Sequence, residues 1–168
     1  MKRAFIGWLI GIVPLLALGA DSNPDESFYK SAGEGGLAEV AVAKLAEAKA
    51  SSAALRDFGG MMVKDHSTAD QKLWATAAHK GVKMPTTPSV EQVAAGDRLK
   101  LLSGDSFDKA YIKNQIESHR DALALFKKEI ASGRDKDASQ FAQTMLPTVQ
   151  AHLDKIMKIA STAGVAVE

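Results

Sequence analysis

Four side chains of types that bind metal ions are spread along the sequence: Glu39, His66, His119 and His152. Projected at 100° per residue, each falls on the apolar face of the helix predicted around it. Three neutral imidazoles and a carboxylate suit one transition-metal ion, such as zinc, iron or copper. The chain has no cysteine, so nitrogen and oxygen would be the only ligand atoms. The fourth histidine, His79, projects away from the apolar face, and we expect it to be solvated.

Capping and helix-breaking residues divide the chain into helices that would position these side chains. The predicted long helices run from Asn23–Pro24 to about Lys49, from Ser51 or Ser52 to about Lys80, from Asp105 or Ser106 to about Ser132, and from Asp137 to Gly164. Asp137 and Gln140 have the spacing of a capping box. Thr87–Pro88 opens a predicted short helix that ends near Ser103–Gly104. Alanine far outnumbers valine and isoleucine, which also favours helix over sheet.

The lengths of the connections predict how these helices are arranged. The first and second long helices are separated by a few residues, as are the third and fourth, so each pair should form an antiparallel hairpin. The connection over 81–105 is longer, and we expect it to run along the bundle. The sequence therefore predicts an all-α, ferritin-like four-helix bundle with a short extra helix in its long connection.

The four metal-binding candidates also match in height along the predicted bundle. The midpoints of the predicted helices fall near residues 37, 66, 119 and 150, so side-by-side packing brings the candidates to one level. Side chains that could orient the imidazoles by hydrogen bonding are Asp65, Tyr111, Gln115 and Thr148. A buried network of histidine and glutamate that only specifies the fold is the alternative interpretation.

Two features inside the predicted helices are unfavourable for a helix. Gly59–Gly60 lies within the second long helix, where each glycine costs about 1 kcal/mol relative to alanine. Pro147 lies within the fourth and donates no backbone hydrogen bond. Either the glycines permit close helix packing and the proline a tolerated bend, or both shape the bundle near its middle.

The first twenty residues have the organisation of a secretory signal peptide. Lys2 and Arg3 precede an apolar run over 4–18, and small residues follow at Ala17, Gly19 and Ala20. The run is too short for a typical membrane span of about 20 residues. We therefore expect residues 1–20 to be removed after Gly19 or Ala20, and 21–168 to form one exported, periplasmic domain. The alternative is that the apolar run is kept as an uncleaved N-terminal anchor.

Composition and motifs exclude several classes of function for that domain. The net charge is +1 and no basic run occurs, so the sequence does not predict nucleic-acid binding. No later segment has the uninterrupted apolar length of a membrane-spanning helix. No nucleophile elbow or phosphate-binding loop is present, and no residue is predicted to be catalytic.

Several of the same residues carry a family resemblance that covers nearly all of the predicted mature chain. The most specific motifs are Met62-Val63-x-Asp65-His66 and Leu146-Pro147 followed by His152. Further matching positions are Phe28, Ala32-Gly33, Gly35, Glu39-Val40, Lys44-Leu45-Ala46, Phe58, Phe107-Asp108, Tyr111, His119, Phe126 and Phe141-Ala142. The chain resembles an exported bacterial family of unknown function with a predicted ferritin-like bundle, often labelled "putative outer membrane protein".

The resemblance implies a ferritin-like fold and an envelope location, and it implies no established activity. Di-iron proteins of ferritin-like fold carry a Glu-x-x-His pair on two helices. Here Val63 and Val149 stand three residues before His66 and His152, so a di-iron oxidase is not expected.

Two functions follow as hypotheses. In the first, a periplasmic bundle binds a single ion through Glu39, His66, His119 and His152 for storage, buffering or stress protection. In the second, a non-catalytic structural or interaction protein of the envelope binds an envelope protein partner, and its inward polar residues serve only the fold.

Overall fold

The computed structural model describes residues 25–166, which form five α-helices and no strand. The helices are α1 (Glu26–Lys49), α2 (Ala53–His79), α3 (Val90–Leu101), α4 (Gly104–Ser132) and α5 (Lys136–Thr162). The predicted all-helical fold, with four long helices and one short one, is confirmed. The predicted signal peptide and the expected cap at Asn23–Pro24 lie outside the described residues.

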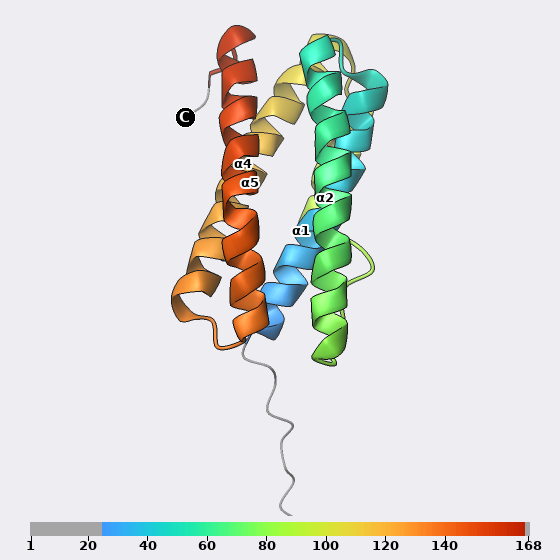
Figure 1. The fold of residues 1–168 in the computed structure, drawn as a ribbon. Helices are drawn as coiled ribbons and strands as arrows, with labels where there is room; N and C mark the ends of the chain where they lie inside the picture. Colours follow the sequence, from blue (N-terminus) through green and yellow to red (C-terminus); the bar gives the residue numbers. More distant parts are fainter. Residues whose placement is uncertain (1–24, 167–168) are drawn as a thin grey trace, which may run out of the picture.

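Four of the helices pack side by side as two antiparallel hairpins (Figure 1). Helix α1 pairs with α2, and α4 pairs with α5. Helix α4 begins beside the α1–α2 turn, because the carboxylate of Asp108 accepts hydrogen bonds from the backbone amides of Ser51 and Ser52 at 2.9 and 3.1 Å. The connection from α2 to α4 therefore returns along the length of the bundle, as predicted, and its helix α3 packs against α1 and α4.

Three helices begin at positions that differ from the predicted ones. Helix α3 is capped by Ser89, which forms a reciprocal capping box with Gln92, and not by Thr87–Pro88. The box satisfies the backbone amides of Ser89 and Gln92.

The starts of α4 and α5 are corrected in the same way. The cap of α4 is Ser103, so Asp105 and Ser106 lie inside its first turn. The cap of α5 is Asp135, whose carboxylate accepts from the amide of Asp137, and the predicted capping box with Gln140 does not form. At the helix ends, Gly81 and Gly164 adopt φ of +68° and +64°, the left-handed conformation that favours glycine.

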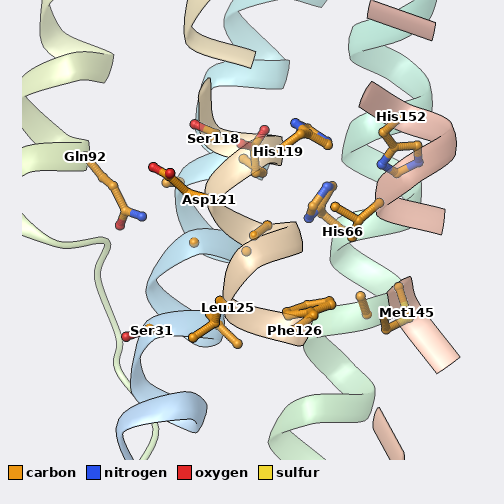
Figure 2. Close-up of a pocket in the computed structure, with 18 of the residues that line it drawn as sticks. Ser31, His66, Gln92, Ser118, His119, Asp121, Leu125, Phe126, Met145 and His152 are labelled. Atoms are coloured by element: carbon orange, nitrogen blue, oxygen red, sulfur yellow. The ribbon is translucent and has the colours of Figure 1, made fainter. Parts of the chain in front are cut away.

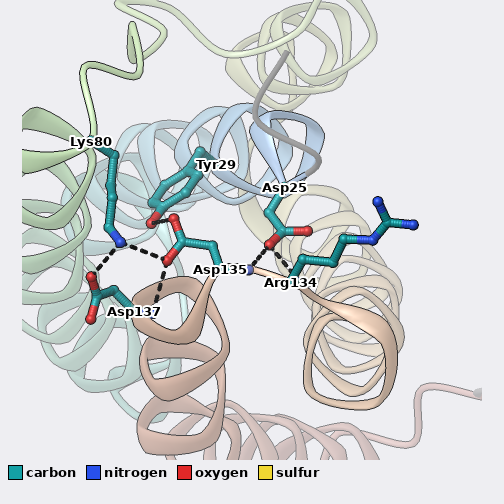
Figure 3. A network of polar contacts seen from close by, with 6 residues as sticks. All are labelled: Asp25, Tyr29, Lys80, Arg134, Asp135 and Asp137. Atoms are coloured by element: carbon teal, nitrogen blue, oxygen red, sulfur yellow. Dashed lines mark hydrogen bonds and ion pairs between the residues drawn. The ribbon is translucent and has the colours of Figure 1, made fainter. Parts of the chain in front are cut away.

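Polar contacts fix the end of the bundle where α1 begins, α2 ends and α4 turns into α5 (Figure 3). The carboxylate of Asp25 accepts hydrogen bonds from the backbone amides of Arg134 and Asp135. The hydroxyl of Tyr29 donates to Asp135 at 3.2 Å, and Lys80 forms an ion pair with the same carboxylate at 3.1 Å. Burial, with the nearby Asp135 carboxylate, raises the pKa of Tyr29, which keeps this hydroxyl protonated as a donor.

The core has an aromatic cluster at each end. Phe28, Phe126 and Phe141 contact one another near the α4–α5 turn, with ring centroids 5.8 to 6.4 Å apart. Towards the α1–α2 turn, Tyr111 stacks on Phe107 at 5.8 Å and meets Phe58 edge-on at 6.4 Å. The middle of the bundle lies between these two apolar layers.

Gly59 permits a close approach between α1 and α2. A Cβ atom at this position would lie 2.8 Å from the carbonyl oxygen of Ala43 and 3.0 Å from the amide nitrogen of Glu47, both backbone atoms of α1. At Gly60 the nearest atom is a carboxylate oxygen of Glu47, at the end of a flexible side chain. Helix α5 continues through Pro147. The structure therefore supports the close-packing interpretation for Gly59.

The two glycines should respond in opposite ways to alanine. Gly59→Ala is expected to lower the free energy of unfolding by about 1–3 kcal/mol, because the methyl group overlaps backbone that cannot move independently. Gly60→Ala is the matched control and should raise it by up to about 1 kcal/mol through helix propensity. Urea denaturation measures both, and equal effects of the two substitutions would contradict the close approach.

Candidate metal centre

Three histidines from three helices meet in the middle of the bundle (Figure 2). They are His66 of α2, His119 of α4 and His152 of α5, with ring centroids 5.5 to 5.9 Å apart. One ring nitrogen of each can be chosen so that all three lie within 4.8 Å of one another. The structure thus brings together three of the four side chains that the sequence predicts as ligands.

Each histidine has a buried ring nitrogen with no hydrogen-bond partner among the described residues. These atoms are Nε2 of His66, Nε2 of His119 and Nδ1 of His152. Two of the rings are held from behind: Nδ1 of His119 donates to the backbone carbonyl of Gln115 at 2.8 Å, and Nε2 of His152 donates to the carboxylate of Asp65 at 3.0 Å. A histidine held through one nitrogen by a carbonyl or carboxylate presents the lone pair of the other, as metal-ligating histidines do.

Burial favours the neutral form of His66 and His152. Burial, together with the neighbouring rings of His119 and His152, lowers the pKa of His66 to about 3. Burial also lowers the pKa of His152, although the hydrogen bond to Asp65 opposes this. The contact between His152 and Asp65 is therefore a hydrogen bond from a neutral ring at neutral pH. Neutral rings are the form that coordinates a metal ion.

The separations suit an ion after a small adjustment. A tetrahedral ion with bonds of about 2.0–2.1 Å to nitrogen sets its ligand atoms roughly 3.4 Å apart. The three nitrogens lie within 4.8 Å of one another, so small rotations of the rings would bring them to that spacing.

Glu39, the fourth predicted ligand, does not belong to this group of three. Its carboxylate accepts a hydrogen bond from the side-chain amide of Gln115 at 2.8 Å, and the residue is 7% exposed. Burial raises the pKa of Glu39, while His119 and the Gln115 hydrogen bond act in the opposite direction. Glu39 thus forms a buried polar pair with Gln115 beside the histidines.

The residues predicted to orient the imidazoles fall into two groups. The side chain of Asp65 contacts His152. Gln115 contacts His119 only through its backbone carbonyl, because its side-chain amide binds Glu39. Tyr111 does not, because it lies two helical turns before His119 and its ring packs in the aromatic cluster with Phe107. Thr148 lies in the wall of the adjoining cavity, and no hydrogen bond links it to a histidine within the described part of the chain.

A cavity of about 510 Å³ adjoins the three histidines, and they form part of its wall. Asp70, one turn after His66 on α2, lies in the same wall, and burial raises its pKa to about 7. A Cβ atom at Gly36 would overlap the Asp70 carboxylate, so the glycine makes room for it. Sequence reasoning missed Asp70, although its spacing of four residues from His66 places the two on one helix face.

The sequence matches a protein-family model over most of its length. Residues 16–159 match the model of a domain of unknown function, DUF4142. The chain belongs to this family. Among curated proteins and among solved structures, none matches it. Family membership therefore supports the resemblance seen in the motifs, and assigns no activity.

Substitutions at Glu39 test its role as a partner of Gln115. Glu39→Ala should lower the free energy of unfolding by about 1–3 kcal/mol, because the buried amide of Gln115 loses its acceptor. Glu39→Gln should have a much smaller effect, since its amide oxygen replaces the acceptor without a buried charge. Chemical denaturation at pH 7 measures both, and an equal loss in the two variants would contradict a hydrogen-bonding role.

The raised pKa of Asp70 predicts that this residue lowers the free energy of unfolding as the pH rises. The unfolded chain loses this proton near pH 4 and the folded chain near pH 7, so the carboxyl's contribution to stability falls as the pH rises between these values. Asp70→Asn should match the parent near pH 4 and exceed it by about 1–2 kcal/mol at pH 8, an amount reduced by the carboxyl's partial contact with solvent. Urea denaturation at several pH values tests this, and a difference independent of pH would refute it.

Proposed function

We propose that this protein binds one divalent transition-metal ion through His66, His119 and His152, in an exported ferritin-like bundle that serves metal storage, buffering or stress protection. The observation that carries the proposal is the meeting of three histidine rings that offer ring nitrogens within 4.8 Å of one another, each ring having a buried nitrogen without a hydrogen-bond partner among the described residues. A buried polar atom left unsatisfied costs about 1–3 kcal/mol. One ion would satisfy all three atoms at once.

The donor set indicates which ions the site would take. Three neutral imidazoles suit zinc, iron and copper, and the chain offers no thiolate. Three protein ligands leave at least one coordination position of a tetrahedral ion open. The residues three positions before the histidines are Val63, Ile116 and Val149, so no glutamate pairs with them in the Glu-x-x-His manner of di-iron sites. A single ion is therefore proposed.

Topology and sequence support the rest of the proposal. Two antiparallel hairpins joined by one long connection along the bundle are the arrangement of ferritin-like folds. The basic, apolar and small residues at the start of the sequence support export to the periplasm. Within the described residues, no helix combines the length and apolar character needed to cross a membrane.

One observation favours the alternative, a structural protein of the envelope that binds a partner protein. The side-chain amide of Gln115 donates a buried hydrogen bond to Glu39, so part of this polar layer is paired without any ion. A polar layer of this kind can specify the pairing of helices. The histidines differ from this pair, because each ring has a buried nitrogen that bonds to no other described residue, and the three rings meet.

Metal content distinguishes the two functions. Protein purified without a histidine tag and dialysed against zinc should contain about one ion per chain by elemental analysis. His66→Ala/His119→Ala should contain less than a tenth of that. His79→Ala is the matched control, because His79 is exposed at the end of α2, and it should retain the parent value.

Thermal unfolding gives a second readout on the same proteins. At an ion concentration one hundred times the dissociation constant, binding stabilises the folded state by about 2.7 kcal/mol, which corresponds to a rise in melting temperature of roughly 5–10 °C. The rise should appear in the parent and in His79→Ala, and a chelator should remove it. Equal metal content in the parent and the double variant, with no shift by chelator, would refute the proposal and favour the structural alternative.

A further inference from the structure

Inside the bundle, the cavity beside the histidines extends from them towards the aromatic cluster of Phe28, Phe126 and Phe141. Towards the α1–α2 turn, the neighbouring layer is filled by Met62, Ile116 and Ile156, which are 0 to 3% exposed. In the opposite direction lies the cavity of about 510 Å³, which extends to Phe126, Phe141 and Met145. In Figure 2 the rings of His66 and His152 lie on one side of this space, and Phe126 and Met145 lie on the other. An ion held by the three rings would be packed on one face and accessible on the other.

We propose that this cavity binds a small neutral molecule, which coordinates the ion through one nitrogen or oxygen atom and packs an apolar body against Phe126 and Met145. The inference rests on the proposed function, because it requires the ion. It extends that function by naming the ligand class that would reach the open coordination position.

The size of the cavity supports a ligand larger than water. Small-molecule sites in proteins typically occupy about 300–1,000 Å³. Small residues line this part of the cavity and leave it open: Ala32, Gly35 and Gly36 in α1 and Ala122 in α4. The side chain of Gln92 approaches Gly35 from α3, where a Cβ atom would meet its amide at 3.9 Å. Helix α3 thus lines the outer part of this cavity.

The charge of the wall indicates a neutral ligand. Glu39 and Asp70 place two carboxyl groups along the inner wall. Apart from the histidines, Arg98 is the one basic side chain among the described residues that line the cavity, and it is exposed on α3. The bound ion would attract an anion, but the anion would lose its hydration and face the carboxyl groups of the wall, which also include Asp65, Glu117 and Asp121 and oppose its entry. A neutral donor atom meets neither obstacle.

The apolar surface of the wall indicates the character of the ligand's body. Leu73, Val149 and the side chains of Phe126, Phe141 and Met145 line the part of the cavity inside the bundle. Fully burying a phenyl-sized group in such surroundings contributes about 1.5–3 kcal/mol, or roughly 10- to 100-fold in affinity. A ligand with such a group should therefore bind more tightly than its donor group alone.

The experiment compares three probes on the cobalt(II)-loaded protein, followed by the visible absorption of the ion. The probes are imidazole, 4-phenylimidazole and azide. Imidazole supplies the donor nitrogen alone, 4-phenylimidazole adds an apolar group to the same donor, and azide is an anion. We expect 4-phenylimidazole to bind at least 10-fold more tightly than imidazole, and azide to bind most weakly.

Two substitutions on α4 show whether the preference comes from the cavity. Ala122→Phe should fill the cavity and abolish the preference for 4-phenylimidazole, while the protein still binds one cobalt ion. Ala124→Phe is the matched control, because residue 124 is exposed two positions further along α4, and it should retain the preference. Ala32→Leu fills the same cavity from α1 and replaces Ala122→Phe if that variant does not fold.

The outcomes separate the inference from the function on which it rests. Cobalt uptake with equal affinity for imidazole and 4-phenylimidazole, or with tighter binding of azide, overturns the inference alone. A preference that survives in a folded cavity-filling variant overturns it as well. A parent protein that takes up no cobalt and no zinc overturns the proposed function, and the inference with it.

Discussion

The structure depends on placing three histidine rings together in the middle of a helical bundle. Each ring is large enough to fill core volume, yet each carries a nitrogen that an apolar environment does not satisfy. Backbone and side-chain acceptors satisfy the outer nitrogens of His119 and His152, through Gln115 and Asp65. The other nitrogen of each of these two rings, and Nε2 of His66, has no hydrogen-bond partner among the described residues, so the three histidines could together hold a metal ion.

This arrangement requires the helices to keep their register, and the two ends of the bundle provide it. One residue of slippage moves a helix by about 1.5 Å, which would separate the ring nitrogens. At one end, Asp108 of α4 holds the first amides before α2. At the other, Asp25 and Asp135 tie the start of α1 to the α4–α5 turn. Both contacts join the α1–α2 hairpin to the α4–α5 hairpin.

Local signals in the sequence predicted the fold well. Helical periodicity, glycines at helix ends and short connections are properties of neighbouring residues, and they predicted the two hairpins and the meeting of His66, His119 and His152. The caps at Ser89, Ser103 and Asp135 lie two or three residues from the predicted positions, because several polar residues near each start could serve.

Contacts between distant segments were harder to predict. Asp108 caps α2 from another helix, and nothing in its local sequence indicates this. Glu39 was predicted as a ligand because it faces inward, but facing inward does not distinguish a ligand from a partner of Gln115. The carboxylate of Asp70 on α2 has room because Gly36 on α1 has no side chain. The pattern of apolar residues within one helix cannot show such a contact with another helix.

The positions of the three histidines along the sequence have a consequence for the conformational entropy of the unfolded chain. His66 belongs to the first hairpin, while His119 and His152 belong to the second. An ion shared by the three would close a loop of 53 residues between His66 and His119. Closing a loop of that length removes about 4 kcal/mol of conformational freedom from the unfolded chain, as a disulfide does. In a protein without cysteine, a coordinated ion would be its reversible cross-link.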